Sequence, residues 1–334
     1  MRVGGKARYF AVAKNIRQLN VALSFAARQS VPIFILGGGS NIVVSDSGFH
    51  GLVLKPDMKG VLIKEHSDSF IVSAAAGENW DSLVETVSSK NIFGLENLSA
   101  IPGTVGAAPV QNIGAYGAEL KNVVLSIEAL DAKTGKTVSL SCDECAFAYR
   151  DSIFKHDEGK HFIITKVVLQ LSKNGILQTK YKDVEQYIAE NNLPEKELTP
   201  ARMRQIITHI RERKLPDVQK IGTAGSFFKN PVISREKFLA LAHVYRELPG
   251  HDIGNGLIKI SAGWIIEKVC KKKGFKKDSV GVYEKQALVL VNYGGSNARA
   301  VKQFAEEIRS DIKRHTGILV EFEISFVGQF DENQ

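Results

Sequence analysis

The sequence predicts an α+β fold, because short apolar strands follow one another directly instead of alternating with helices. Apolar segments with the length and composition of strands occur at 32–36, 42–44, 51–54, 61–64 and 70–74. No helical stripe separates these segments, whereas a doubly wound parallel sheet places a helix after each strand. A glycine cluster after the first of them also lacks the dinucleotide fingerprint spacing and is followed by strand, not helix.

The remaining elements are predicted from apolar periodicity and end signals. Helices are expected at 15–29, 80–90, 181–192, 199–213, 238–245, 264–271 and 297–315. Further strands are expected at 7–13, 162–171, 287–292 and 318–327, with a hairpin formed by 123–130 and 136–140.

Composition limits the classes of protein that the chain can be. Its 334 residues are enough for about two domains, and 44% apolar and 24% charged residues are ordinary for a soluble protein. There is no apolar run long enough for a membrane span and no secretory signal, so we expect a cytoplasmic protein. The Cys142-x-x-Cys145 pair lacks a second ligand pair, so we expect no metal.

The net charge of +8 is compatible with two kinds of partner. Nucleic acid is one, but the basic residues are dispersed and form no stripe with aromatic residues, so we expect no nucleic-acid binding. A small anionic substrate explains the same charge.

The stretch from Phe93 to Gly117 is rich in glycine, nearly free of charge and punctuated by apolar residues, which predicts a packed irregular segment. One interpretation is a tight core loop. The other is a phosphate or cofactor cradle, in which glycines let a ligand approach backbone N–H groups. We favour the cradle, and Gly37 to Asn41 is a second candidate of the same kind.

Three places carry polar groups that pattern alone does not explain. Arg150 and Asp151 could be a local ion pair, Ser226 a turn hydroxyl, and the pair Glu321 and Glu323 one solvent-facing side of the last strand. Together they fit reduction of an alkene beside a carboxylate. Such a reaction needs a cation or donors at the enolate oxygens, a proton donor for the α-carbon and a hydride from a cofactor.

Seven ordered motifs resemble those of the UDP-N-acetylenolpyruvoylglucosamine reductase family, MurB, of type I, and they cover nearly the whole chain. They are LGGGSNIVV (36–44), IPGTVGAAPVQNIGAYG (101–117), YRDSIFK (149–155), GTAGSFFKNPVIS (222–234), SAGWIIEKV (261–269), ALVLVN (287–292) and VEFEISFVG (320–328). The resemblance implies a two-part FAD-binding domain of the PCMH or vanillyl-alcohol-oxidase type, followed by a smaller α+β substrate-binding domain.

The resemblance also implies domain boundaries. The FAD-binding domain is expected at 1–175, with lobes 1–57 and 58–175. A helical connection at 176–218 carries Tyr181, and the substrate-binding domain follows at 219–328.

The activity implied is NADPH-dependent reduction of UDP-N-acetylglucosamine enolpyruvate to UDP-N-acetylmuramate in peptidoglycan synthesis, by a monomer that binds NADPH and substrate in one shared site. Arg150 would stabilise the enolic intermediate, Ser226 would donate the proton, and Glu323 would be the catalytic glutamate with Glu321 as its neighbour. The substrate-binding residues implied are Tyr149, Tyr181, Arg211, Lys214, Asn230 and Gln286. The FAD-binding residues implied are Leu36, Gly37, Gly38, Gly39, Ser40, Asn41, Ile42, Pro102, Gly103, Thr104, Gly106, Ala107, Gln111, Asn112, Gly114 and Ala115.

Two other functions remain as alternatives. An FAD-dependent oxidase acting on an alcohol would use the same cofactor fold but would need a base for a hydroxyl proton, which the GSFFKNP motif does not call for. A non-catalytic FAD or nucleotide-sugar binding protein would be expected to lack at least one of Arg150, Ser226 and Glu323, and all three are present.

Overall fold

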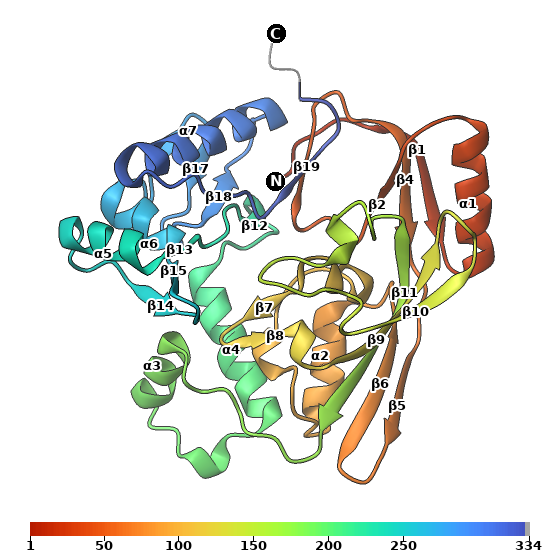
Figure 1. Cartoon of the computed structure of the whole chain (residues 1–334), viewed down its shortest axis with the longest axis horizontal. Coiled ribbons are helices and arrows are strands. Elements are labelled where there is room, and N and C mark those ends of the chain that lie inside the picture. The colour runs from red at the N-terminus through yellow and green to blue at the C-terminus, as the bar shows by residue number, and fades with distance from the viewer. Residues whose placement is uncertain (331–334) are drawn as a thin grey trace. The chain divides into compact units, whose positions relative to one another are not determined.

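The computed structural model describes residues 1–330, and contacts gather the chain into two compact units (Figure 1). The N-terminal unit consists of Ala7–Gly39 and His50–Arg211. The C-terminal unit consists of Met1–Lys6, Ser40–Phe49 and the chain from Glu212 onward. Two short segments from the start of the sequence therefore fold with its last third. The domain boundaries expected from the sequence stay a prediction.

The N-terminal unit contains two main sheets. One has the strand order β1-β4-β2 and consists of β1 (Ala7–Ala13), β4 (Phe49–Pro56) and β2 (Ile33–Ile35), packed with α1 (Ile16–Arg28). The other has the order β10-β9-β11-β6-β5, with every neighbouring pair antiparallel. Its strands are β10 (Thr137–Ser141), β9 (Val124–Asp131), β11 (Phe162–Ser172), β6 (Ser69–Ala75) and β5 (Val61–Glu65). The predicted hairpin is confirmed as β9 and β10.

Helix α2 (Trp80–Ser89) covers the core of the five-stranded sheet. Its apolar positions Trp80, Leu83, Val84 and Val87 are at most 2% exposed and pack with residues of β6 and β11. Asn79 caps the helix, since its side chain accepts a hydrogen bond from the Ser82 N–H at 2.9 Å. The periodicity read from the sequence thus identified both the helix and its buried face.

The rest of the N-terminal unit consists of short elements and two further helices. The stretch predicted to be packed and irregular is so: Val105 and Ile113 are buried between 3₁₀ turns and two-residue strands. These short elements are Glu96–Leu98, Val105–Ala107, Pro109–Gln111, β7 (Gly114–Ala115), β8 (Ala118–Glu119), Leu120–Asn122, Ile153–Lys155 and Glu195–Glu197. The helices are α3 (Lys182–Glu190) and α4 (Pro200–Lys214), whose last three residues, from Glu212, belong to the C-terminal unit. Thr199 caps α4 as predicted, because its hydroxyl oxygen accepts from the Arg202 N–H at 3.1 Å.

The C-terminal unit contains a four-stranded sheet of order β12-β18-β17-β16 and a three-stranded sheet of order β13-β15-β14. The strands are β12 (Gly222–Ser226), β18 (Val289–Asn292), β17 (Val280–Val282), β16 (Lys276–Lys277), β13 (Val232–Ser234), β15 (Leu257–Ile260) and β14 (Gly250–Asp252). Helix α7 (Ala298–Thr316) contributes the predicted stripe of Val301, Phe304, Ala305, Ile308 and Ile312 to the core. Helix α5 (Arg235–Val244) begins three residues earlier than predicted, after the Ser234 cap.

Two predictions for this unit are wrong in detail. The segment expected to be a helix at 264–271 is a short α-helix, α6 (Ala262–Trp264), continued by a π-helical turn at Ile265–Val269. The strand expected at 318–327 is only β19 (Ser325–Val327), which pairs in parallel with β3 (Ile42–Val44). The chain bends at Glu323 and Ile324 because the residues before the bend pair with a different partner, at Phe228.

No helix among residues 1–330 is both long and apolar enough to cross a membrane.

Candidate active site

The two glycine segments predicted to hold a cofactor meet inside the N-terminal unit. A Cβ placed on Gly38 would lie 2.7 Å from the Gly103 Cα, and one on Gly37 would lie 2.6 Å from the Ala107 Cβ. Real Cβ atoms do not approach other atoms so closely. Residues 37–38 and 103–107 are therefore packed backbone against backbone, although about 65 positions separate them in the sequence.

This packing changes the explanation for some of the glycines. A Cβ on Gly106 would lie 2.6 Å from the Ala76 Cβ, and one on Gly114 would lie 2.9 Å from the Ala118 carbonyl oxygen. These two positions require glycine because of protein neighbours, not because a ligand approaches. The N–H groups of Val105 and Gly106 likewise donate to the carbonyls of Glu78 and Ala76, both at 2.9 Å. The tight-loop interpretation thus holds for this part of the stretch.

A cavity of about 570 Å³ lies beside both segments, within the N-terminal unit. Five of the predicted cofactor residues line it: Leu36, Gly37, Thr104, Gly106 and Ala107. Apolar side chains of β2 and β11, together with Leu23, Val110 and Phe154, form much of the remaining wall. A cavity with a largely apolar wall suits a ligand with a flat ring system.

The loop after β2 offers the polar part of such a site. Gly38 and Gly39 are exposed, and within residues 1–330 no protein acceptor takes their N–H groups. Gly39 has a φ of +68°, a left-handed conformation that glycine adopts at no steric cost. Backbone N–H groups in such loops bind phosphate, so the residues present fit the FAD that the family resemblance implies.

Three members of the predicted cofactor set belong to the C-terminal unit instead. Ser40, Asn41 and Ile42 lie in or before β3. The Asn41 side-chain amide donates to the Glu323 carbonyl oxygen at 3.1 Å, and the Asn41 carbonyl accepts from the Ser325 N–H at 3.0 Å. Whatever else they bind, these residues fix the backbone that carries Glu323.

Arg150 occupies a tight turn on the N-terminal unit. Ala148 and Asp151 exchange backbone hydrogen bonds at 3.1 and 3.3 Å, and Arg150 between them has a φ of +55°. This is an uncommon conformation for a side chain of that size, and such residues concentrate at functional sites. The Arg150 Nη2 donates to the Gly114 carbonyl at 2.8 Å, and its guanidinium lies 5.5 Å from the centre of the Tyr149 ring.

Asp151 contacts a different residue, His156. Its carboxylate lies 2.8 Å from the His156 Nε2. Burial by itself raises the pKa of the Asp151 carboxyl. The hydrogen bonds from His156 and from the Ser152 N–H lower it by more than burial raises it, so the net pKa is below the usual value.

Ser226 stands at an irregularity of the four-stranded sheet. The pairing of β12 with β18 shifts register between Thr223 and Ser226, and Gly225 before it has a φ of +77°. A bulge with a left-handed glycine re-aims the next side chain, which explains why a glycine precedes this serine. The two residues that follow, Phe227 and Phe228, are fully buried and anchor the strand end.

Glu323 is held directly beside this strand end. Its N–H donates to the Phe227 carbonyl at 2.8 Å, and Phe228 stacks on Phe322 with ring centres 5.4 Å apart. Ser226 and Glu323 are therefore brought together by the backbone of the C-terminal unit. Glu321 is exposed and pairs with Lys229 at 2.8 Å. Neither glutamate lies in the final strand as predicted, since β19 begins only at Ser325.

Two predicted substrate residues on the N-terminal unit, Tyr181 and Arg211, gather around Tyr116. The Tyr116 and Tyr181 rings meet edge to face at 5.3 Å. The Arg211 guanidinium donates a hydrogen bond to the Tyr116 hydroxyl oxygen. Burial raises the pKa of the Tyr116 hydroxyl to about 12. Tyr116 was not predicted from the sequence, although a large tyrosine beside two glycines was the available signal.

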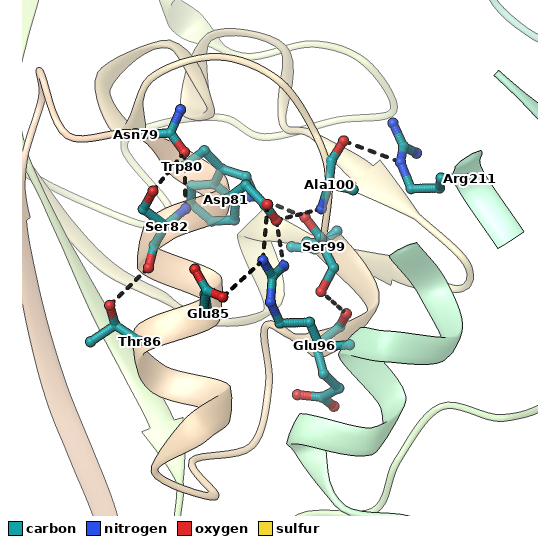
Figure 2. A network of polar contacts seen from close by, with 12 residues as sticks. Asn79, Trp80, Asp81, Ser82, Glu85, Thr86, Glu96, Ser99, Ala100 and Arg211 are labelled. Atoms are coloured by element: carbon teal, nitrogen blue, oxygen red, sulfur yellow. Dashed lines mark hydrogen bonds and ion pairs between the residues drawn. The ribbon is translucent and has the colours of Figure 1, made fainter. Parts of the chain in front are cut away.

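Arg211 also reaches the segment that leads into the cofactor loop. Its Nε donates to the Ala100 carbonyl at 3.2 Å, while the Asp81 carboxylate accepts the Ala100 N–H on the other side (Figure 2). Ala100 has a φ of +56° and directly precedes Ile101 and Pro102. Asp81 in turn binds both Nη atoms of Arg204 on α4. This network was not predicted from the sequence, because its bonded partners lie up to 123 positions apart.

The predicted substrate residues Lys214, Asn230 and Gln286 lie in the C-terminal unit. The Asn230 Oδ1 accepts from the Ala262 N–H at 3.0 Å, and the Gln286 Oε1 accepts from the Leu288 N–H at 3.4 Å. Both residues are half-buried and belong to the unit that also carries Ser226 and Glu323.

The thiols of the Cys142-x-x-Cys145 pair are not joined in a disulfide. Cys142 and Cys145 are free, and burial raises the pKa of Cys145 to about 12, so its thiol is protonated at neutral pH.

Comparison with known proteins covers both units. A family model described as an FAD binding domain matches residues 7–141, and one described as the UDP-N-acetylenolpyruvoylglucosamine reductase C-terminal domain matches residues 216–327. Two curated relatives carry that reductase name. The one from Bdellovibrio bacteriovorus is 43% identical over 296 residues, 88% of this chain and 86% of its own length. The one from Chromobacterium violaceum is 38% identical over 318 residues, 95% of this chain and 92% of its own length.

A solved structure has the same fold. The crystal structure of UDP-N-acetylenolpyruvylglucosamine reductase from Thermus caldophilus aligns over 95% of this chain and 91% of its own, with a TM-score of 0.64 and 20% sequence identity. The predicted fold class, an FAD-binding domain followed by an α+β substrate-binding domain, is confirmed.

Proposed function

The chain belongs to the UDP-N-acetylenolpyruvoylglucosamine reductase family, and from this premise we propose that it reduces UDP-N-acetylglucosamine enolpyruvate to UDP-N-acetylmuramate. NADPH is the reductant, the reaction serves peptidoglycan synthesis in the bacterial cytoplasm, and the enzyme works as a monomer. One observation in particular supports the proposal. A hydroxyl and a carboxyl group, Ser226 and Glu323, are fixed on adjacent backbone at the end of β12, and the reduction needs a proton donor and a second hydrogen-bond donor.

The N-terminal unit carries the FAD-binding domain. When bound, FAD supplies the hydride chemistry that no amino-acid side chain offers. The exposed backbone at Gly38 and Gly39 would hold the pyrophosphate, and the cavity lined by Leu36, Thr104 and Ala107 would take an apolar ring. The other predicted cofactor residues remain proposals, except Asn112, whose side chain is buried and fully engaged within the unit.

Arg150 would bind the carboxylate of the enolpyruvyl group. Hydride addition to the β-carbon places negative charge on the carboxylate oxygens, and a guanidinium donates two parallel hydrogen bonds to such a group. The left-handed turn and the bond to the Gly114 carbonyl limit the conformations that Arg150 can adopt. A donor positioned in advance stabilises the developing charge without reorganisation.

Ser226 would pass its hydroxyl proton to the α-carbon, and Glu323 in its neutral form would donate a hydrogen bond to the enolic oxygens. The glycine before Ser226 and the two buried phenylalanines after it leave the serine little freedom. The overall change adds a hydride and a proton across the double bond and converts NADPH to NADP⁺.

The remaining proposed contacts serve the UDP group of the substrate. Tyr149, Tyr181 and Arg211 from the N-terminal unit, with Lys214, Asn230 and Gln286 from the C-terminal unit, supply cations, amides and aromatic rings for a diphosphate and a base. NADPH and the substrate share these groups in turn, and the net charge of +8 suits two anionic ligands.

Turnover with the candidate substrate tests the proposal. NADPH oxidation is followed at 340 nm with and without UDP-N-acetylglucosamine enolpyruvate, and the product is identified by mass spectrometry. We expect NADPH loss that depends on the enolpyruvyl substrate, and a product heavier by two hydrogen atoms. The alcohol-oxidase alternative predicts oxygen consumption with an alcohol and no such product.

A further inference from the structure

Asn112, expected from sequence to bind FAD, has its side chain fully engaged inside the protein. It is 0% exposed. Its Nδ2 donates to the Glu119 carboxylate and to the Ala148 carbonyl, both at 3.0 Å, and its Oδ1 accepts from the Lys121 N–H at 3.0 Å. An amide has two N–H donors. Both are used here, so in this arrangement the side chain has none left for a cofactor.

Ala148, whose carbonyl accepts one of these bonds, is the first residue of the turn that contains Arg150. Two other bonds join the same pieces of chain: the Ser152 hydroxyl donates to the Val110 carbonyl at 2.6 Å, and Arg150 itself donates to the Gly114 carbonyl at 2.8 Å. Residues 110–114 therefore form hydrogen bonds with the turn at three places: at Ala148 before Arg150, at Arg150 itself, and at Ser152 after it. All of these groups belong to the N-terminal unit.

We propose that Asn112 is a positioning residue for Arg150: its buried amide holds the 148–151 turn so that the guanidinium meets the substrate carboxylate. The role rests on the proposed function of Arg150. Asn112 itself has a φ of +43°, a left-handed conformation that asparagine tolerates better than most residues. Its residue type is therefore required twice, once by the backbone and once by the side-chain donors.

Asn112→Asp isolates the donors, since aspartate keeps the shape and also tolerates the left-handed conformation. The new carboxylate faces the Ala148 carbonyl and the Glu119 carboxylate, so both contacts are lost. We expect the reoxidation of the reduced flavin by the enolpyruvyl substrate to slow by about 10- to 100-fold at saturating substrate, the scale of a misplaced catalytic group. Flavin reduction by NADPH forms no enolate and should keep its rate within about twofold.

A double variant separates the two contacts. In Asn112→Asp with Glu119→Gln, the glutamine amide can donate to the new carboxylate and removes the repulsion, while the contact with the Ala148 carbonyl stays lost. We expect it to regain thermal stability but not the reoxidation rate. Asn91→Asp is the matched control, because Asn91 is also left-handed (φ +55°) but exposed, and it should match the unmodified protein in every measurement.

The combination with Arg150→Ala shows whether Asn112 acts through Arg150. We expect Asn112→Asp to add less than threefold to the slowing caused by Arg150→Ala alone, since a residue that works through Arg150 has nothing left to position. Multiplied losses would overturn the proposal, as would an equal fall of both half-reactions or unchanged reoxidation in Asn112→Asp. Failure of the unmodified protein to be reoxidised by the enolpyruvyl substrate would instead remove the proposed function, and the positioning role with it.

Discussion

The network around Asp81 predicts a specific loss when its charge is removed. Asp81 receives a hydrogen bond from the Ala100 N–H (Figure 2). It also receives hydrogen bonds from both Nη atoms of Arg204. Asp81→Asn keeps one carbonyl oxygen but turns an NH₂ group toward a guanidinium that is itself a donor. The substitution therefore leaves part of Arg204 without an acceptor and loosens the segment that enters the cofactor loop.

The size of the loss follows from burial. The side chains of Arg204 and Asp81 are 15% and 33% exposed, so this is not a solvent-exposed pair of the kind worth 0–1 kcal/mol. Losing hydrogen bonds to a charged group of this kind costs about 1.5–3 kcal/mol. For a unit of this size that corresponds to a fall in melting temperature of roughly 3–12 °C. FAD affinity should fall as well, because Ala100 directly precedes Ile101 and Pro102 of the proposed cofactor loop.

The assay is thermal unfolding of the protein, with flavin release as the signal that reports on the N-terminal unit. FAD affinity is measured separately by fluorescence titration. Glu85→Gln is the control: Glu85 lies 3.9 Å from Arg204 and is 68% exposed, so its loss should be small. Burial raises the pKa of Asp81, but hydrogen bonds from Arg204 and Ala100 bring it below the usual 3.8. The stabilisation is therefore present above pH 3.8 and should fade as pH falls through the lower, folded value. Equal losses in the two variants would refute the reasoning.

The other predictions concern the chemistry and the cofactor loop. Ser226→Ala should leave flavin reduction by NADPH nearly intact and slow reoxidation by the enolpyruvyl substrate about 10²- to 10⁴-fold, as measured by stopped flow; equal losses in both half-reactions would make the serine structural. Glu323→Gln should slow the same half-reaction, while Glu321→Gln should cost little because Glu321 is exposed and paired with Lys229; similar losses would contradict the choice between them. Gly38→Ala should release FAD, since its Cβ would lie 2.7 Å from the Gly103 Cα, and unchanged FAD titration would show that the two loops are not packed as described.

Local patterns predicted most of the helices and strands, and the resemblance supplied the site residues. Apolar spacing identified α2 and α7 with their buried faces, because one side of each helix packs on its own unit's core. The alternation in the last ten residues before Gly328 misled, since it describes two short pairings with different partners, at Phe228 and at Ile42–Val44. Periodicity indicates which side chains are buried, but it does not indicate which strand pairs with the segment.

The polar contacts that support the site could not be predicted from local sequence patterns. Asn112 reaches Ala148 across 36 positions, and Asp81 reaches Arg204 across 123. Both residues look ordinary in sequence, as one amide in a glycine-rich stretch and one acidic residue in the first turn of a helix. Their partners are fixed only when the unit has folded, so these roles could be found only in the structure.

An anaerobic titration of the purified protein, followed by the visible flavin band, is the direct test of the proposed reduction. NADPH is added until the band is bleached, and UDP-N-acetylglucosamine enolpyruvate is then added in measured amounts. One equivalent of the enolpyruvyl compound should restore the band and be converted to UDP-N-acetylmuramate. A bleached flavin that stays reduced in the presence of excess enolpyruvyl compound would contradict the proposed reduction.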